Sequence, residues 1–133
     1  MDNRSDVWRG VDAIKPRFID LSDRVWGMPE VCYTEARSSA EHLAELKHQG
    51  FRITENVADI PTAVMGEWGE GGTIIAFLGE YDALPGLSQE AGVAEHRPVE
   101  AGGHGHGCGH NLLGSAALLA ATAVKDWLAA HKV

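Results

Sequence analysis

The side chains best suited to chemistry in this sequence are gathered between Gly102 and Asn111. Three histidines and one of the two cysteines in the chain lie there, each separated from the next by one glycine. Imidazole and thiolate are borderline-soft donors that suit zinc and the later first-row metals. The glycines leave the backbone free to bend closely around an ion. This stretch therefore predicts a ligand site, although these residue types alone leave its chemistry open.

Four interpretations of the stretch compete. A structural zinc knuckle requires a second ligand pair, and Cys108 has no partner of Cys-x-x-Cys type. A phosphate loop fits alternating glycines before a helix, but no lysine follows in the Walker position. Exposed histidines can also gather by chance. A catalytic metal site fits best, because Glu80 and Asp82 follow an apolar run, although taken alone these two acids could equally lie on an ordinary surface.

The elements that must position these residues begin with three predicted helices. A 4-3-4-3-4 apolar spacing over residues 7–25 predicts the first helix, with a kink or break caused by Pro16. The second helix is expected over residues 34–49. The third is expected over residues 112–133, with Asn111 as its N-cap. The glycine-rich stretch thus leads directly into a helix.

Three apolar runs between the second and third helices predict strands. They cover residues 51–54, 62–68 and 73–79, and the last two flank a glycine turn typical of a hairpin. The third run is apolar on both faces, so we expect it inside a sheet. Cys108 and His110 are two residues apart, so an extended backbone would place both on one face. The order of elements predicts an α/β layer arrangement.

Size and charge limit the possible functions. The 133 residues suffice for one domain, and a formal net charge of -8 disfavours nucleic acid or an anionic membrane as partner. Lys125 and Asp126 interrupt the last apolar run, so no membrane-spanning segment is expected. No signal-peptide segment is apparent at the start, so we expect a cytoplasmic protein with reduced cysteines.

Three motifs in order along the chain resemble one enzyme family. Residues 106–110 resemble the His-x-Cys-Gly-His motif of the M20 metallopeptidase and amidohydrolase family. Residues 26–35 and 79–85 resemble its Pro-Glu-Leu-x-Phe-x-Glu and Asp-Met-Asp-Ala-Leu-Pro segments. The similarity is to the branch of aminoacylase-like and aminobenzoyl-glutamate-hydrolysing enzymes. The residues that resemble its aminobenzoyl-glutamate utilisation protein B subgroup are Trp26, Glu80, Tyr81 and Asn111.

The resemblance implies a role for each matching residue. Cys108 and His110 match metal-ligand positions of a site for two divalent ions, Zn²⁺ or Mn²⁺. His106 matches the leading histidine of the motif and is a further candidate metal ligand. Asp82 matches the active-site aspartate, which orients a ligand or the substrate complex. Glu80 stands where more distant relatives carry a metal-binding histidine, and the resemblance gives it no ligand role.

The activity implied by the resemblance is hydrolysis of the amide bond of N-acyl or N-aryl amino acids, such as p-aminobenzoyl-glutamate, by a metal-activated water. The implied fold is α/β. Residues 1–133 would form the N-terminal part of a zinc-peptidase-like three-layer catalytic domain with a mixed sheet, with the lid domain absent. The general base and remaining ligands of the family lie downstream of the motif, so we expect the isolated chain to be inactive.

The resemblance also implies an assembly, because full-length relatives are expected to be homodimers or hetero-oligomers acting on a small-molecule substrate. A competing hypothesis comes from another class of protein. In it, the chain is a non-catalytic His/Cys module or remnant that binds an ion without hydrolysing anything.

Overall fold

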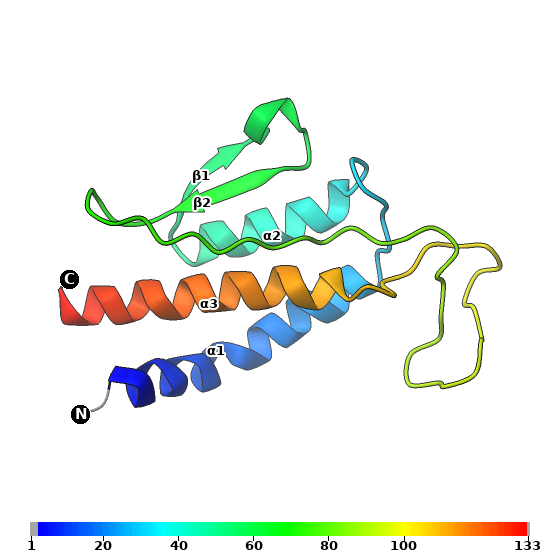
Figure 1. The fold of residues 1–133 in the computed structure, drawn as a ribbon, viewed down its shortest axis with the longest axis horizontal. Helices are drawn as coiled ribbons and strands as arrows, with labels where there is room; N and C mark the ends of the chain where they lie inside the picture. The colour runs from blue at the N-terminus through cyan, green and yellow to red at the C-terminus, as the bar shows by residue number, and fades with distance from the viewer. Residues whose placement is uncertain (1–2, 133) are drawn as a thin grey trace.

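The computed structural model describes residues 3–132, which form a small α/β structure (Figure 1). The helices are α1 (Asn3–Trp26), α2 (Ala36–His48) and α3 (His110–His131), and the strands are β1 (Arg52–Glu55) and β2 (Val64–Glu67). A short 3-10 helix, η1 (Val57–Asp59), lies between the two strands. The α/β class is confirmed, but residues 3–132 contain only a two-stranded sheet and form no three-layer domain.

The core lies between α1 and α3, which pack along each other (Figure 1). Its buried cluster consists of Phe18, Leu21, Val25 and Leu118. Full burial of one such side chain stabilises a fold by about 1.5–3 kcal/mol. Of the predicted kink or break at Pro16, the break is absent, because α1 continues through the proline. Ile14 and Phe18, on either side of this proline, pack in the same core and so hold both halves of the helix on it.

The start of α3 differs from the prediction, because the helix begins at His110 after Gly109. Gly109 has a left-handed backbone, with φ of 80°. Asn111, the predicted cap, is buried inside the first turn instead. Its side-chain amide donates a hydrogen bond to Oγ of Ser22 in α1 at 3.0 Å. This bond fixes the first turn of α3 on α1. Asn111 therefore packs inside the helix, and Gly109 occupies the N-cap position.

The two strands β1 and β2 form one antiparallel pair, in which Thr54 lies opposite Met65. The first two predicted strands are thus confirmed, the first moved by one residue and the second shorter than predicted. The predicted hairpin is wrong, because the partner of β2 is β1 and not residues 73–79.

Residues 73–79 form an extended, exposed segment that Figure 1 shows in green, running beside α3. Within residues 3–132, no backbone hydrogen bond joins this segment to a neighbouring strand. A strand needs a second backbone about 4.8 Å away, and none of the described chain takes that place. The apolar side chains of the segment are left in solvent, and Ile74 and Leu78 are each 89% exposed.

The helix α3 has the length and composition of a helix that could cross a membrane, contrary to the expectation from Lys125 and Asp126. This observation is weak evidence for a membrane, because core helices of globular domains meet the same criteria. One face of α3 packs on α1 and contributes Leu118 to the core.

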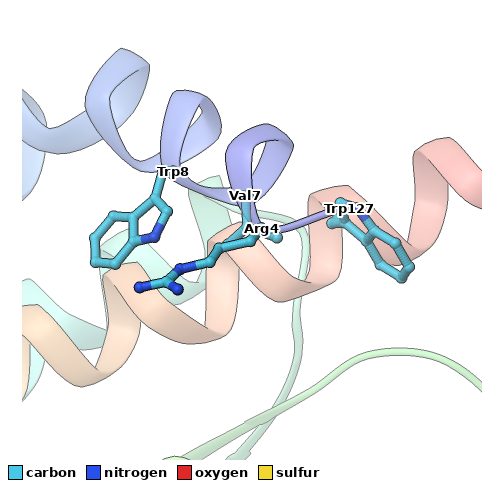
Figure 2. A pocket seen from close by; sticks show the side chains of 4 residues that line it. All are labelled: Arg4, Val7, Trp8 and Trp127. Carbon is cyan, nitrogen blue, oxygen red and sulfur yellow. The ribbon is translucent and has the colours of Figure 1, made fainter. Parts of the chain in front are cut away.

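An open apolar groove lies between the start of α1 and the end of α3, with a volume of about 400 Å³. Figure 2 shows its lining residues, which are Arg4, Val7, Trp8 and Trp127. The groove lies near the opposite end of α3 from His110 and contains no group of acidic or metal-binding side chains. It is therefore not the candidate site for the chemistry predicted above.

Two glycines allow the extended segment to cross α3 closely. A Cβ added to Gly114 would lie 2.6 Å from the backbone oxygen of Glu80 and 2.8 Å from Nε2 of His42. A Cβ added to Gly79 would lie 2.9 Å from Cα of Gly114. Real side chains do not pack at these separations, so the crossing requires residues without Cβ. It carries Glu80 and Asp82 to the first turn of α3.

We predict that Gly114→Ala lowers the free energy of unfolding by about 1–3 kcal/mol, the usual cost of overpacking an interior. Gly10→Ala is the matched control, because Gly10 also lies inside a helix and an added Cβ there meets nothing within 4 Å. That control should raise stability by about 0.5–1 kcal/mol through helix propensity. Urea unfolding followed by circular dichroism measures both changes, and equal effects would contradict the close crossing.

Candidate metal centre

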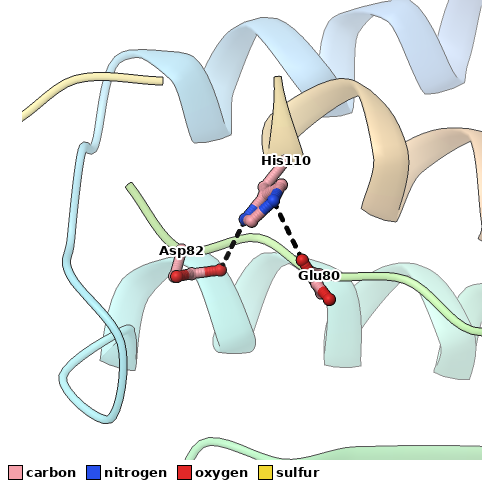
Figure 3. Close-up of side chains that lie close together, drawn as sticks. All are labelled: Glu80, Asp82 and His110. Carbon is pink, nitrogen blue, oxygen red and sulfur yellow. Dashed lines mark hydrogen bonds and ion pairs between the residues drawn. The ribbon is translucent and has the colours of Figure 1, made fainter. Parts of the chain in front are cut away.

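His110 lies between two carboxylates where the extended segment crosses α3 (Figure 3). Its Nδ1 is 2.7 Å from Oδ1 of Asp82, and its Nε2 is 2.9 Å from Oε2 of Glu80. One possible ligand atom from each residue lies within 4.8 Å of the other two. The side chain of Glu80 is 59% exposed, against 21% for Asp82 and 17% for His110. The acidic cluster is therefore open to solvent on the Glu80 side.

Each member of the cluster is positioned by local structure. Glu80 and Asp82 are two residues apart in an extended segment, so both side chains point to the same face. His110 is the first residue of α3 and is held by the bond from Asn111 to Ser22 described above. The geometry of the cluster therefore follows from the extended backbone of residues 80–82 and from the packing of the first turn of α3 on α1.

Short backbone bridges join the three sequence motifs around the site. The N–H of Ala83 donates to the carbonyl of Glu30 at 2.7 Å. Leu84 and Gly105 exchange two hydrogen bonds of 3.0 Å, each N–H donating to the other carbonyl. These bridges fix the chain immediately after Asp82. They explain why three motifs far apart in the sequence belong to one site.

Glu30 also anchors the start of α2. Its carboxylate accepts hydrogen bonds from the backbone N–H of Arg37 at 3.1 Å and from that of Ser38 at 2.9 Å. Burial would raise the pKa of Glu30, but the hydrogen bonds from Ser38 and Arg37 outweigh burial and hold the pKa below its ordinary value. The folded state therefore favours the carboxylate over the acid.

This shift predicts how acid affects stability. A lowered folded-state pKa means that the stability from Glu30 is complete above the ordinary value of 4.5. It is lost as pH falls through the lower folded-state value. Glu30→Gln should cost about 1–3 kcal/mol at pH 7 and reduce the loss below pH 4.5. Unfolding curves between pH 7 and pH 3 measure this (control: the exposed Glu70→Gln), and parallel pH profiles for both variants would contradict it.

His106 lies beside the cluster with one ring nitrogen available. Its Nε2 donates to the carbonyl of Val25 at 3.1 Å, which leaves Nδ1 without a proton in the neutral ring. Nδ1 is buried, and among the described residues it has no hydrogen-bond partner. Burial lowers the pKa of His106 and so favours the neutral, metal-binding form, and the charges of His110 and Asp82 also act on this pKa. A ligand role for His106 stays a prediction.

Cys108 lies outside the cluster in this structure. Its thiol is free and exposed, in the turn before α3. The extended backbone that would place Cys108 and His110 on one face is absent, because Gly109 is left-handed and His110 is helical. His104 is exposed in the preceding loop. A ligand role for Cys108 remains a prediction from the motif.

Glu80 belongs to the cluster, although the family resemblance gives it no role as a metal ligand. The signal was its spacing of two residues from Asp82, which places both carboxylates on one face of an extended segment. The residues after the apolar run thus predict both carboxylates near a metal site, and the structure places Glu80 next to His110.

The cluster fits a divalent ion by the chemistry of its donors. One imidazole and two carboxylates suit zinc or manganese. The 2.9 Å between Nε2 of His110 and Oε2 of Glu80 is a hydrogen-bonding distance, and the two atoms would move apart by a few tenths of an ångström to reach the roughly 3.3–3.5 Å between two ligands of one tetrahedral zinc ion. A carboxylate on the other ring nitrogen is the usual partner of a metal-binding histidine. His110 and Glu80 could thus hold an ion, with Asp82 orienting the imidazole.

Comparison with curated proteins identifies the relatives. Over 119 residues the chain is 52% identical to a subunit of the p-aminobenzoyl-glutamate hydrolase of Escherichia coli (strain K12). The chain is homologous to this hydrolase subunit. The match covers 89% of the chain and 24% of that protein. The predicted relation to aminobenzoyl-glutamate-hydrolysing enzymes is therefore confirmed.

More distant relatives are also hydrolases. The chain is 29% identical to the Xaa-Arg dipeptidases of Mus musculus, over 126 residues, and of Homo sapiens, over 131 residues. These matches cover 86% and 89% of the chain and 25% and 26% of the dipeptidases. The chain thus spans about a quarter of the length of its relatives. No family model matches the chain, so its assignment to the M20 family stays a prediction.

We predict that His110→Ala lowers Zn²⁺ affinity by more than tenfold, because it removes a ligand. Asp82→Asn should lower it by about 10–100-fold, since it weakens the bond that orients the imidazole. His104→Ala is the control, because His104 is a loop histidine outside the cluster. Isothermal titration calorimetry measures all three affinities. Equal affinities in the three variants would remove the cluster as a metal centre.

Proposed function

We propose that this chain supplies metal-binding residues to a metal-dependent amidohydrolase that cleaves N-acyl or N-aryl amino acids, with p-aminobenzoyl-glutamate as the best candidate substrate. The observation that carries the proposal is the position of His110 between Asp82 and Glu80. It is supported by the name of a relative that is 52% identical over the matched residues, a p-aminobenzoyl-glutamate hydrolase subunit. The Xaa-Arg dipeptidases are likewise named for cleaving a bond to an amino acid.

The residues of the chain have distinct parts in this proposal. A divalent ion at the cluster would supply a Lewis acid for the amide carbonyl and activate water. Asp82 accepts a hydrogen bond from Nδ1–H of His110 and so holds the orientation of the ring. Glu80 brings a negative charge to the solvent side, where an ion and a substrate would enter. We assign Cys108 and His106 to the completion of a two-ion site for Zn²⁺ or Mn²⁺.

The proposed fold context is a larger sheet. Residues 73–79 would be an interior strand of the mixed sheet in a three-layer catalytic domain, with residues 1–133 as its N-terminal part. The support is that this apolar segment is extended, exposed and without backbone partners in the described chain. The general base and further ligands would then come from polypeptide beyond these residues, and the isolated chain would be inactive.

The proposed setting of the enzyme is a cytoplasmic assembly of more than one subunit. The bacterial relative is named as one subunit of its hydrolase, which supports a hetero-oligomer.

A chimera tests the proposed activity. The 119 matching residues of the bacterial subunit would be replaced by those of this chain, and hydrolysis of p-aminobenzoyl-glutamate measured in the assembled enzyme. We expect activity in the chimera, its loss by more than 100-fold with His110→Ala, and no loss with His104→Ala. A folded, metal-loaded chimera without activity would contradict the proposal and favour a non-catalytic metal-binding module.

A further inference from the structure

The side chain of Tyr81 lies between the two carboxylates in sequence and faces away from them in space. In an extended segment alternate residues point to opposite sides, so Glu80 and Asp82 face His110 while Tyr81 faces α2. The Tyr81 ring packs against His42 of α2, with 4.7 Å between ring centroids. The phenol hydroxyl donates to the backbone carbonyl of Thr62, just before β2. The Tyr81 side chain thus links residues 80–82 to α2 and to the chain just before β2.

The platform under Tyr81 is rigid. His42 is only 4% exposed, and its Nδ1 donates to the carbonyl of Ser38 at 3.0 Å within α2. Burial lowers the pKa of His42 and keeps the ring neutral against the tyrosine. The other edge of the ring faces α3, where a Cβ on Gly114 would come within 2.8 Å of Nε2. The ring is therefore fixed between two helices.

The backbone of residues 73–82 contributes little to holding Glu80 and Asp82 in place. Over residues 73–82, no backbone hydrogen bond is formed with the rest of the described chain. The first such bond comes at Ala83, whose N–H donates to Glu30 at 2.7 Å. Between Gly79 and this bond, Glu80 and Asp82 contact only His110 on one face, and the Tyr81 side chain is the contact on the other face. Its loss would free Glu80 and Asp82 to shift relative to His110.

We propose that Tyr81 is a positioning residue of this centre, which sets the places of the Glu80 and Asp82 carboxylates around His110. The inference deepens the metal-site function proposed above and rests on it for its consequence in metal binding. Tyr81 touches neither ion nor substrate in this account. It acts through the backbone of its two neighbours, as supporting partners of metal ligands do.

The test compares the two tyrosines of the chain. Tyr81→Phe removes only the hydroxyl that bonds to Thr62, and Tyr81→Leu also removes the ring on His42. Tyr33→Phe is the matched control, because the Tyr33 side chain is 71% exposed. Phe18→Leu, in the core cluster against which Tyr81 also packs, controls for a loss of stability that leaves the Tyr81 side chain in place. Zn²⁺ affinity would be measured by calorimetry, and the hydrogen bonds of the His110 ring by its side-chain ¹⁵N chemical shifts.

We expect Tyr81→Phe to lower Zn²⁺ affinity by about tenfold, and Tyr81→Leu by at least as much, the usual range for residues that support metal ligands. The His110 ring ¹⁵N shifts should change in both variants. Tyr33→Phe and Phe18→Leu should keep the affinity and the shifts of the wild type.

Two results would overturn the inference. Tyr81→Phe could match the wild type in affinity and in the His110 shifts, or Phe18→Leu could lose as much affinity as Tyr81→Phe. A wild-type chain that binds no Zn²⁺ would instead contradict the proposed metal function. In that case the ¹⁵N shifts of His110 alone decide the role of Tyr81: changed shifts in Tyr81→Phe support it and unchanged shifts refute it.

Discussion

The site depends on the close contact between Gly79 and Gly114, which brings residues 80–82 against α3. Residues with a Cβ at these places would separate the two backbones, since the added atoms would meet backbone or ring atoms at less than 3 Å. Separation would move Glu80 away from Nε2 of His110, now at 2.9 Å. The close packing of Gly79 on Gly114 thus determines how near Glu80 lies to His110.

Around that contact, the fold supports the site from three directions. Asn111 bonds to Ser22 and fixes the turn that carries His110. The carbonyl of Glu30 holds Ala83, just after Asp82. Tyr81 holds the centre of the segment from its other face. Each support comes from a different part of the chain, so local changes in any of them would be felt at the same cluster.

How far the sequence predicts this structure depends on whether an interaction is local. Apolar periodicity finds the three helices and two strands, and the donor chemistry and motifs lead to Asp82 and His110. Periodicity cannot show that residues 73–79 lack a pairing strand, because pairing depends on a distant backbone. Asn111 has the right type for a cap, but its bond to Ser22, far away in sequence, takes precedence. The donor chemistry also points to Glu80 beside Asp82, although the family resemblance gives Glu80 no ligand role.

The central claim is that an ion binds between His110 and Glu80, with Asp82 behind the imidazole. Anomalous diffraction at the zinc absorption edge, from crystals of this chain soaked in Zn²⁺, tests it most directly. The account predicts a peak within bonding distance of Nε2 of His110 and Oε2 of Glu80, while Nδ1 keeps its bond to Asp82. A peak bound to other side chains only, or no peak at this cluster, would contradict the account.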